Sequence, residues 1–401
     1  MAQTLKRDRT VEQQLVHGPI DLPFLMLVVV LTVIGVITVF SASYPAAINT
    51  GLAPTYYFSR QAVFAGMGLV IMYVISKVNY QAFRGLSIFV LGVAILLLVL
   101  VLIPGMHTVR PDGVKRWLKG IGPIPAFQPS ELAKLGVILY FSARMSKRES
   151  EKKRLYSKRT YSGVLLQKLD DIGLIELVPY GMILLLIMLL MKQEPHMSGT
   201  ILILVPAAAI LFAGGIKLGW FAVGGAGVAG LLALMLNDYQ SSRIAIWKDP
   251  WSDFHGKGYQ IIQSLYAIGS GGLFGVGFGQ SRQKFLFIPE PENDFIFSVW
   301  CEEMGLVGAC VVLALFALLI VRGYWIALHA RDRFGSLLVV GITTLMAVQV
   351  FLNISVVTNL LPTTGISLPF FSYGGTALLI QLAEMGIVLG VSRQIPAAKQ
   401  G

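Results

Sequence analysis

Three carboxylates stand where a polar segment meets an apolar one. Glu290, Glu292 and Asp294 all lie in Pro289-Glu-Pro-Glu-Asn-Asp-Phe-Ile-Phe297. A carboxylate at a lipid–water boundary is partly desolvated, and both desolvation and nearby like charge raise a carboxyl pKa toward that of a general base. Asp294 is therefore the candidate catalytic residue. The alternative is structural, because an Asp at this place can cap the helix that follows.

The segment 237–296 before this helix is too long for a simple connector and is rich in groups that bind or react. Among them are Arg243, Gln263 and Lys284. It also contains a glycine-rich stretch over 269–279. A phosphate cradle is one interpretation, but the stretch has no Walker lysine and no strand–turn–helix context. Close backbone packing or a bend is the favoured interpretation.

Charged residues also occur inside apolar runs, where they are costly unless they are paired or face a cavity. Glu131 and Lys134 are three residues apart, so they share one helix face and are expected to pair. This pair is either a structural lock or one wall of a polar cavity. Glu302 and Glu303 are expected to be structural partners of basic residues elsewhere, in preference to direct catalysis.

The composition identifies a membrane protein. The chain has 401 residues, of which 55% are hydrophobic and 13% are charged, and its mean hydropathy is +0.71. Soluble domains carry about a quarter charged residues. The predicted fold is all-α and polytopic, with about ten transmembrane helices near 22–43, 60–78, 85–104, 129–145, 175–192, 198–214, 217–236, 296–322, 336–358 and 373–392.

The basic residues predict the orientation. Most of the 32 Lys and Arg residues fall on the cytoplasmic side if both termini are cytoplasmic. The chain is expected to be a single membrane domain over 1–401, with a cytoplasmic tail at 1–20, a basic cytoplasmic loop at 144–173 and a large extracytoplasmic loop at 237–296 between spans seven and eight. Arg110 and its basic neighbours in the 105–128 loop, like those in 237–296, break the usual bias, and an anionic ligand is the plainest reason.

Two other classes of function are disfavoured. The net charge of +11 comes from short clusters between apolar runs, without a DNA-binding motif, so no nucleic-acid partner is expected. The five histidines show no paired metal-ligand spacing, so no metal site made by the protein alone is expected.

An ordered set of motifs resembles the SEDS family (shape, elongation, division and sporulation), and is closer to its FtsW and SpoVE branch than to RodA. The motifs are Arg116-Trp117 with Gln128-Pro-Ser-Glu131, Gly258-Tyr-Gln260 with Gln263-Ser264, Ile288-Pro-Glu290 with Asp294-Phe-Ile-Phe297 and Glu302-Glu303-Met-Gly305, and Leu361-Pro-Thr-Thr-Gly-Ile-Ser-Leu-Pro-Phe370 with Ser372-Tyr-Gly-Gly375. There is one departure: His196 stands where many members of the family carry an acid.

The resemblance implies a peptidoglycan glycosyltransferase of the bacterial cytoplasmic membrane, which polymerises lipid II at the outer face for cell division or sporulation and releases undecaprenyl pyrophosphate. It implies a class B penicillin-binding protein and divisome or sporulation proteins as partners, beside membrane lipid and the nascent glycan strand. Asp294 corresponds to the essential aspartate of the family. The residues expected to bind substrate are Arg116, Trp117, Glu131, Lys134, Arg243, Gln263, Lys284, Glu290 and Ser372.

Three points stay open. A leaving pyrophosphate needs neutralising charge, which Arg116, Arg243 and Lys284 would supply alone or with a divalent cation such as Mg²⁺ or Mn²⁺. A lipid II flippase is the first alternative function, although a transporter should concentrate its polar groups near the bilayer midplane. A non-catalytic scaffold for the penicillin-binding protein is the second.

Overall fold

The computed structural model describes residues 18–108, 115–120, 126–148, 173–194, 197–234, 238–256, 258–285 and 287–395. Arg110 and His196 lie outside these residues. So do 149–172 of the predicted basic loop and 1–17 of the predicted cytoplasmic tail.

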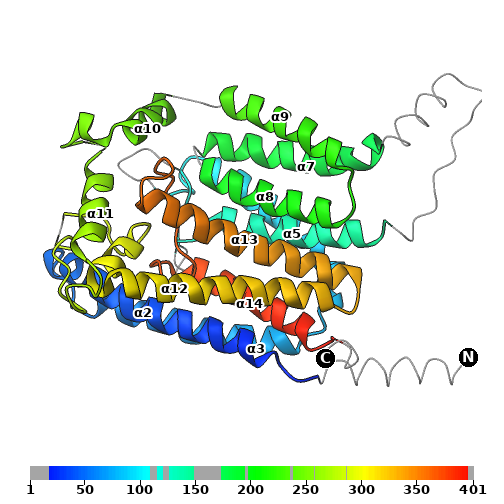
Figure 1. Ribbon diagram of the computed structural model, residues 1–401. Helices are drawn as coiled ribbons and strands as arrows, with labels where there is room; N and C mark the ends of the chain where they lie inside the picture. The colour runs from blue at the N-terminus through cyan, green and yellow to red at the C-terminus, as the bar shows by residue number, and fades with distance from the viewer. Residues whose placement is uncertain are drawn as a thin grey trace, which may run out of the picture. The chain divides into compact units, whose positions relative to one another are not determined.

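The described part of the chain is helical, and its only β-structure is two isolated bridges, His107–Leu118 and Leu118–Phe127. The helices are α2 (Leu22–Asn49), α3 (Tyr56–Lys77), α4 (Gln81–Leu102), α5 (Pro129–Ser146), α7 (Leu174–Gln193), α8 (Met197–Ala213), α9 (Leu218–Leu234), α10 (Asp238–Lys248), the 3-10 helix η1 (Pro250–Asp253), α11 (Tyr259–Ser270), α12 (Ile296–His329), α13 (Arg333–Val357) and α14 (Gly375–Ser392) (Figure 1).

The all-α, polytopic membrane fold is confirmed. Seven described helices are long and apolar enough to cross a membrane, namely α2, α3, α4, α7, α12, α13 and α14. The other three predicted spans also form helices: α5 carries several charges, and α8 and α9 have 17 residues each. The total number of spans therefore stays a prediction.

Local signals explain where individual helices begin and end. Asp21 is the N-cap of α2, and its side chain accepts a hydrogen bond from the backbone N–H of Phe24 at 3.0 Å. Pro129 is the first residue of α5, where its missing N–H costs nothing. Gly214 and Gly215 make the tight turn between α8 and α9, with Gly215 at a φ of 84°.

The chain forms two compact units, and the predicted single domain over 1–401 stays a prediction. The first unit comprises residues up to Tyr80, Leu231–Arg331 and Ile342 onward. Within it, α3 packs on α14, α2 packs on α12 and α3, and α11 packs on α12.

The first unit has two polar ends joined by α12. At one end Arg322 pairs with Asp21 at 2.8 Å, and Arg393 donates to the carbonyl of Gly18. At the other end α12 begins directly after the loop 289–295, which contains Asp294 and is called the Asp294 loop. Arg322 lies 26 residues after Ile296, the first residue of α12, and an α-helix rises 1.5 Å per residue, so the two ends lie at most roughly 40 Å apart. That length exceeds the hydrocarbon core of a bilayer.

The second unit comprises Gln81–Gly230 and Asp332–Gly341. Here α4 packs on α5 and α7, and α8 packs on α5 and α7. Arg148 pairs with Glu176 at 2.7 Å. Arg148 and Arg333 both donate to the carbonyl of Gly214, so two cations fix the end of α8.

Candidate active site

The polar segment before α12 is largely ordered structure. It holds α10, η1 and α11, and the residues after α11 lie against a break in α12. At that break Gly305 has φ 65° and ψ −167°, which is not helical. The backbone amides of Leu306 and Val307 donate to the carbonyls of Gly272 and Leu273. In the other direction, the backbone amides of Val276 and Gly277 donate to the backbone carbonyls of Glu302 and Glu303. The segment 272–277 thus satisfies the backbone groups that the broken helix leaves open.

The glycine-rich stretch is needed for this close approach. A Cβ at Gly271 would meet the carbonyl of Cys301, and a Cβ at Gly275 would meet the backbone of Glu303 and Gly305. Gly275 also has a φ of 81°, a conformation that favours glycine. Close backbone packing, the favoured interpretation of this stretch, is confirmed.

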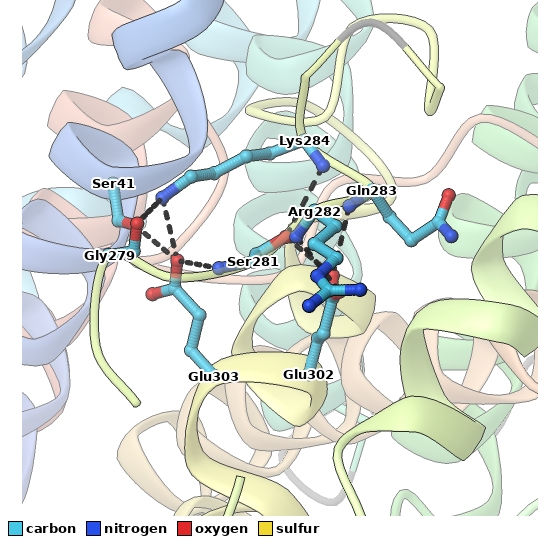
Figure 2. A network of polar contacts seen from close by, with 8 residues as sticks. All are labelled: Ser41, Gly279, Ser281, Arg282, Gln283, Lys284, Glu302 and Glu303. Carbon is cyan, nitrogen blue, oxygen red and sulfur yellow. Dashed lines mark hydrogen bonds and ion pairs between the residues drawn. The ribbon is translucent and has the colours of Figure 1, made fainter. Parts of the chain in front are cut away.

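A buried ion pair fixes the next part of the segment (Figure 2). The Lys284 ammonium lies 2.8 Å from Glu303 Oε1, from the Ser41 hydroxyl and from the carbonyl of Gly279. Ser41 in turn donates to Glu303 Oε1 at 2.6 Å. Lys284 and Glu303 are 3% and 1% exposed. Glu303 is therefore a structural partner of a basic residue, as expected from its place in an apolar helix.

Glu302 has different partners. Its carboxylate accepts hydrogen bonds from the Ser281 hydroxyl and from the backbone amides of Arg282 and Gln283. Figure 2 shows both glutamates projecting from α12 onto the same turn. Lys284, which the sequence suggested as a pyrophosphate ligand, is placed in this turn with its charge already paired. Its role toward substrate stays a prediction.

Asp294 is held at the start of α12 by a residue far away in the sequence. The side-chain amide of Asn353 donates to the carbonyl of Asp294 at 2.8 Å and to that of Ile366 at 2.7 Å. A Cβ at Gly365 would lie 3.7 Å from Asp294 Oδ2. The carboxylate thus faces the 362–366 segment. The helix begins at Ile296 with Phe295 as its N-cap residue, directly after Asp294, so the capping role of Asp294 stays a prediction.

The rest of the Asp294 loop is fixed by its backbone. Tyr373 donates its N–H to the carbonyl of Glu292 at 2.8 Å. Gln61 of α3 donates to the carbonyl of Ser372 and accepts from the N–H of Gly374. Glu290 has a φ of 46°, and its carboxylate accepts from Asn293 at 2.8 Å. Glu290 and Ser372 therefore belong to the same cluster of loops as Asp294.

Glu292 was noted in the sequence only as a charge near Asp294, without a role of its own. It is 6% exposed, and its Oε2 has no hydrogen-bond partner. Burial has the largest effect and raises the pKa of Glu292; a hydrogen bond from its own backbone N–H lowers this pKa, and the charges of Glu290 and Asp294 raise it by smaller amounts. Its alternation with the other two acids was the only signal in the sequence.

Other predicted substrate residues of the first unit lie on helices of the polar segment. Arg243 of α10 donates to the carbonyl of Thr363 at 2.7 Å, so it contacts the segment that approaches Asp294. Trp247 on the same helix donates to the carbonyl of Asn359. Gln263 is buried on α11. Its neighbour Ser264 binds the Ser298 hydroxyl and the carbonyl of Val357.

The remaining predicted residues belong to the second unit. Glu131 and Lys134 are both buried and lie 2.8 Å apart, so their pairing within one helix is confirmed. The carbonyl of Trp117 accepts from the N–H and the hydroxyl of Thr108. Arg116 donates from Nε to the carbonyl of Glu194 at 3.4 Å. The substrate contacts of these four residues stay predictions.

Glu194 is a second buried acid that sequence reasoning missed. It follows the last residue of α7 and is 0% exposed, and neither carboxyl oxygen has a hydrogen-bond partner. Burial raises its pKa to about 8, although the Arg116 charge acts in the opposite direction. Glu194 is therefore mostly protonated at neutral pH. The residues that the structure describes include no group of three or more His, Cys, Asp or Glu side chains placed to hold a metal ion.

Comparison with known proteins gives a consistent result. Stage V sporulation protein E of Bacillus subtilis is 39% identical over 93% of this chain and 97% of its own length. A probable peptidoglycan glycosyltransferase FtsW of Geobacter sulfurreducens is 36% identical over 94% and 96%. Among solved structures, the crystal structure of the rod shape determining protein RodA of Thermus thermophilus aligns with a TM-score of 0.62 at 27% identity, over 94% of this chain and 98% of that one.

A chain from a structure that describes the coordination of polymerization and crosslinking by a peptidoglycan synthase complex aligns with a TM-score of 0.72. Its identity is 28%, over 94% of this chain and 99% of that one. The sequence model of the FtsW, RodA and SpoVE cell cycle proteins matches residues 22–396. The chain belongs to this family of membrane proteins, which the motifs had suggested.

Proposed function

We propose that this protein is a peptidoglycan glycosyltransferase that polymerises lipid II, with Asp294 as the catalytic base. The observation that carries the proposal is the placement of Asp294. Its backbone is fixed by Asn353 and its carboxylate faces the 362–366 segment, at the polar end of a membrane-spanning helix. The likeness to proteins named peptidoglycan glycosyltransferase supports the substrate class.

The proposed step is an inverting displacement between two lipid-linked sugars. Asp294 accepts the proton of the acceptor 4-hydroxyl while that oxygen forms a bond to the anomeric carbon of the donor. The bond from that carbon to the pyrophosphate breaks, and undecaprenyl pyrophosphate leaves with the electron pair. A positioned general base contributes about 10²–10⁴-fold to such a rate. We expect the Asp294 carboxylate to supply this contribution.

The leaving pyrophosphate needs positive charge near it. In the first unit we assign this role to Arg243, whose bond to Thr363 places it on the segment that approaches Asp294. The side chains of the described residues do not form a metal cluster of their own. A divalent cation such as Mg²⁺ or Mn²⁺ would bind at the pyrophosphate of the substrate. Arg116, Trp117, Glu131 and Lys134 remain proposed contacts of the second unit.

The site is proposed to open at the outer face of the bacterial cytoplasmic membrane, with both termini cytoplasmic. This orientation puts Asp294 outside and the Arg322–Asp21 end of α12 inside, in agreement with the excess of Lys and Arg in the loops assigned to the cytoplasm. The proposed partners are a class B penicillin-binding protein and proteins of division or sporulation. The similarity to one chain of a peptidoglycan synthase complex supports the first of these.

One assay separates the enzyme from its two alternatives. The full-length protein, purified with its penicillin-binding partner and with every other glycosyltransferase absent, is given lipid II. An enzyme makes glycan chains in detergent. A flippase moves lipid II across a vesicle bilayer without making chains, and a scaffold does neither. The absence of chains, despite a monodisperse and correctly inserted protein, would contradict the proposed function.

A further inference from the structure

Glu292 lies beside the proposed base, and its burial needs an explanation. A buried carboxylate normally has its oxygens hydrogen-bonded, because an unpaired buried charge is very costly. Glu292 is only 6% exposed, yet its Oε2 has no hydrogen-bond partner. A neutral carboxylic acid tolerates this environment far better than a carboxylate does. The geometry therefore favours the protonated form.

The backbone of this loop is also fixed in place. The carbonyl of Glu292 accepts from the N–H of Tyr373, and Tyr373 stacks edge-on against Tyr57 at 5.1 Å between ring centroids. Two residues further on, the carbonyl of Asp294 accepts from Asn353. The backbones of the two inner acids are thus tied to two different places, the segment before α14 and the helix α13.

The groups that face Glu292 are mostly acidic or phenolic. Glu290 and Asp294 on its own loop both act on its charge. The charge of Glu292 also acts on the hydroxyl groups of Tyr57 in α3 and of Tyr373 before α14. Two cations reach this cluster: Arg60 of α3 bonds to the hydroxyl of Tyr56 and lies near Tyr373, and Arg243 of α10 bonds to the carbonyl of Thr363, on the segment that faces Asp294. The described residues around Glu292 thus disfavour its ionised form, which would place a second negative charge next to Asp294.

We propose that Glu292 stays protonated beside Asp294, so that a neutral acid and an ionised base act together as a coupled pair of carboxyl groups. The inference rests on the proposed function and adds a positioning residue to it. Coupled acids of this kind lose their protons in two macroscopic steps. The first step, at lower pH, ionises Asp294 and activates the site. The second ionises Glu292 and puts three negative charges on one loop.

The second ionisation should lower activity, because the extra charge repels the pyrophosphate of the lipid-linked donor. The direction is set by burial, which together with Glu290 and Asp294 raises the pKa of Glu292. Activity is therefore highest between the two steps and falls as the pH rises through the raised pKa. A bell-shaped pH profile of kcat/KM reports both groups in the free enzyme.

The test measures kcat/KM for lipid II as a function of pH in the full-length protein with its partner. Glu292→Gln is neutral at every pH, so it should keep the acidic limb of the wild-type profile and lose the alkaline limb. The matched variant Glu290→Gln removes an exposed acid of the same loop and leaves Glu292 in place. It should keep the alkaline limb but move it to lower pH, because one of the charges that raise the Glu292 pKa is gone.

Two results would overturn the inference: an alkaline limb that Glu292→Gln leaves unchanged, or a Glu292→Gln protein that folds but is inactive at every pH. If Glu292→Gln does not fold, the direction of the Glu290→Gln shift decides, since an unmoved limb contradicts the pair. Wild-type protein that makes no glycan would contradict the proposed function itself, so the two failures are distinguishable.

Discussion

Asn353 donates a hydrogen bond of 2.8 Å to the carbonyl of Asp294 and a second of 2.7 Å to that of Ile366. One side-chain amide of α13 thereby ties the start of α12 to the loop that faces the Asp294 carboxylate. A base must be held in place to be effective, and a misplacement of about 1 Å can cost about 10²-fold in rate. Asn353 is therefore expected to matter for catalysis without touching substrate.

Replacing Asn353 with Asp tests this relationship. The side chain keeps its shape but loses both donors, so two carbonyls face a carboxylate. We expect kcat for glycan synthesis to fall by on the order of 10–10²-fold, with a smaller change in KM. Asn359→Asp is the control, since the Asn359 amide makes only a long contact of 3.5 Å to the carbonyl of Trp247. Equal rates in the two variants would remove Asn353 from the account.

Variants of the Lys284–Glu303 pair test whether Lys284 has a structural role or binds the pyrophosphate. Lys284→Met leaves a buried carboxylate without its cation, which typically costs about 3–5 kcal/mol. Thermal unfolding in detergent should show a strongly lowered midpoint. The double variant Lys284→Met with Glu303→Gln removes both charges, so it should recover much of that midpoint and of the polymerisation rate. Recovered stability with no recovered activity would instead indicate that Lys284 binds the pyrophosphate.

Two glycines near the end of α11 make a matched pair. A methyl group at Gly271 would meet the carbonyl of Cys301, whereas nothing lies within 4 Å of a methyl group at Gly269. We expect Gly271→Ala to lower the unfolding midpoint and the activity, because the added methyl group would push the 272–277 segment away from the backbone of α12 at its break. Gly269→Ala should be neutral or stabilising by up to about 1 kcal/mol, since alanine favours helix. A tolerated Gly271→Ala would contradict the described contact.

Glu194 predicts how stability depends on pH. Burial raises its pKa from 4.5 to about 8, so the folded protein keeps a proton that the unfolded chain releases. This contribution to stability is complete below pH 4.5 and is lost as the pH rises to about 8. Glu194→Gln cannot ionise, so its unfolding midpoint should fall less than that of the wild type over this range. Parallel curves for the two proteins would contradict a buried neutral Glu194.

Features that depend on residues close in sequence could be predicted. Apolar runs located the helices, because a bilayer sets their length and composition. The Glu131–Lys134 pair follows from a separation of three residues on one helix face. The glycine-rich stretch implied close backbone contact, since only glycine leaves room for it.

Contacts between distant residues could not be predicted in the same way. Lys284 was expected to meet substrate, yet it pairs with Glu303 after the chain has folded back on α12. Nothing local links Asn353 to Asp294, which lies 59 residues away. The backbone of Glu292 is bonded to Tyr373, far along the chain, and burial is the main cause of its raised pKa, so this pKa is a tertiary effect that the acidic motif alone does not reveal.

The central claim is that Asp294 is the base for glycan synthesis. The most direct measurement is the rate of lipid II polymerisation by purified Asp294→Asn with its partner, compared with the wild type at the same amount of folded protein. Asparagine keeps the size of the side chain but cannot take the proton, so the rate should fall by at least about 10²-fold while the unfolding midpoint stays near that of the wild type. A rate close to that of the wild type would contradict the account.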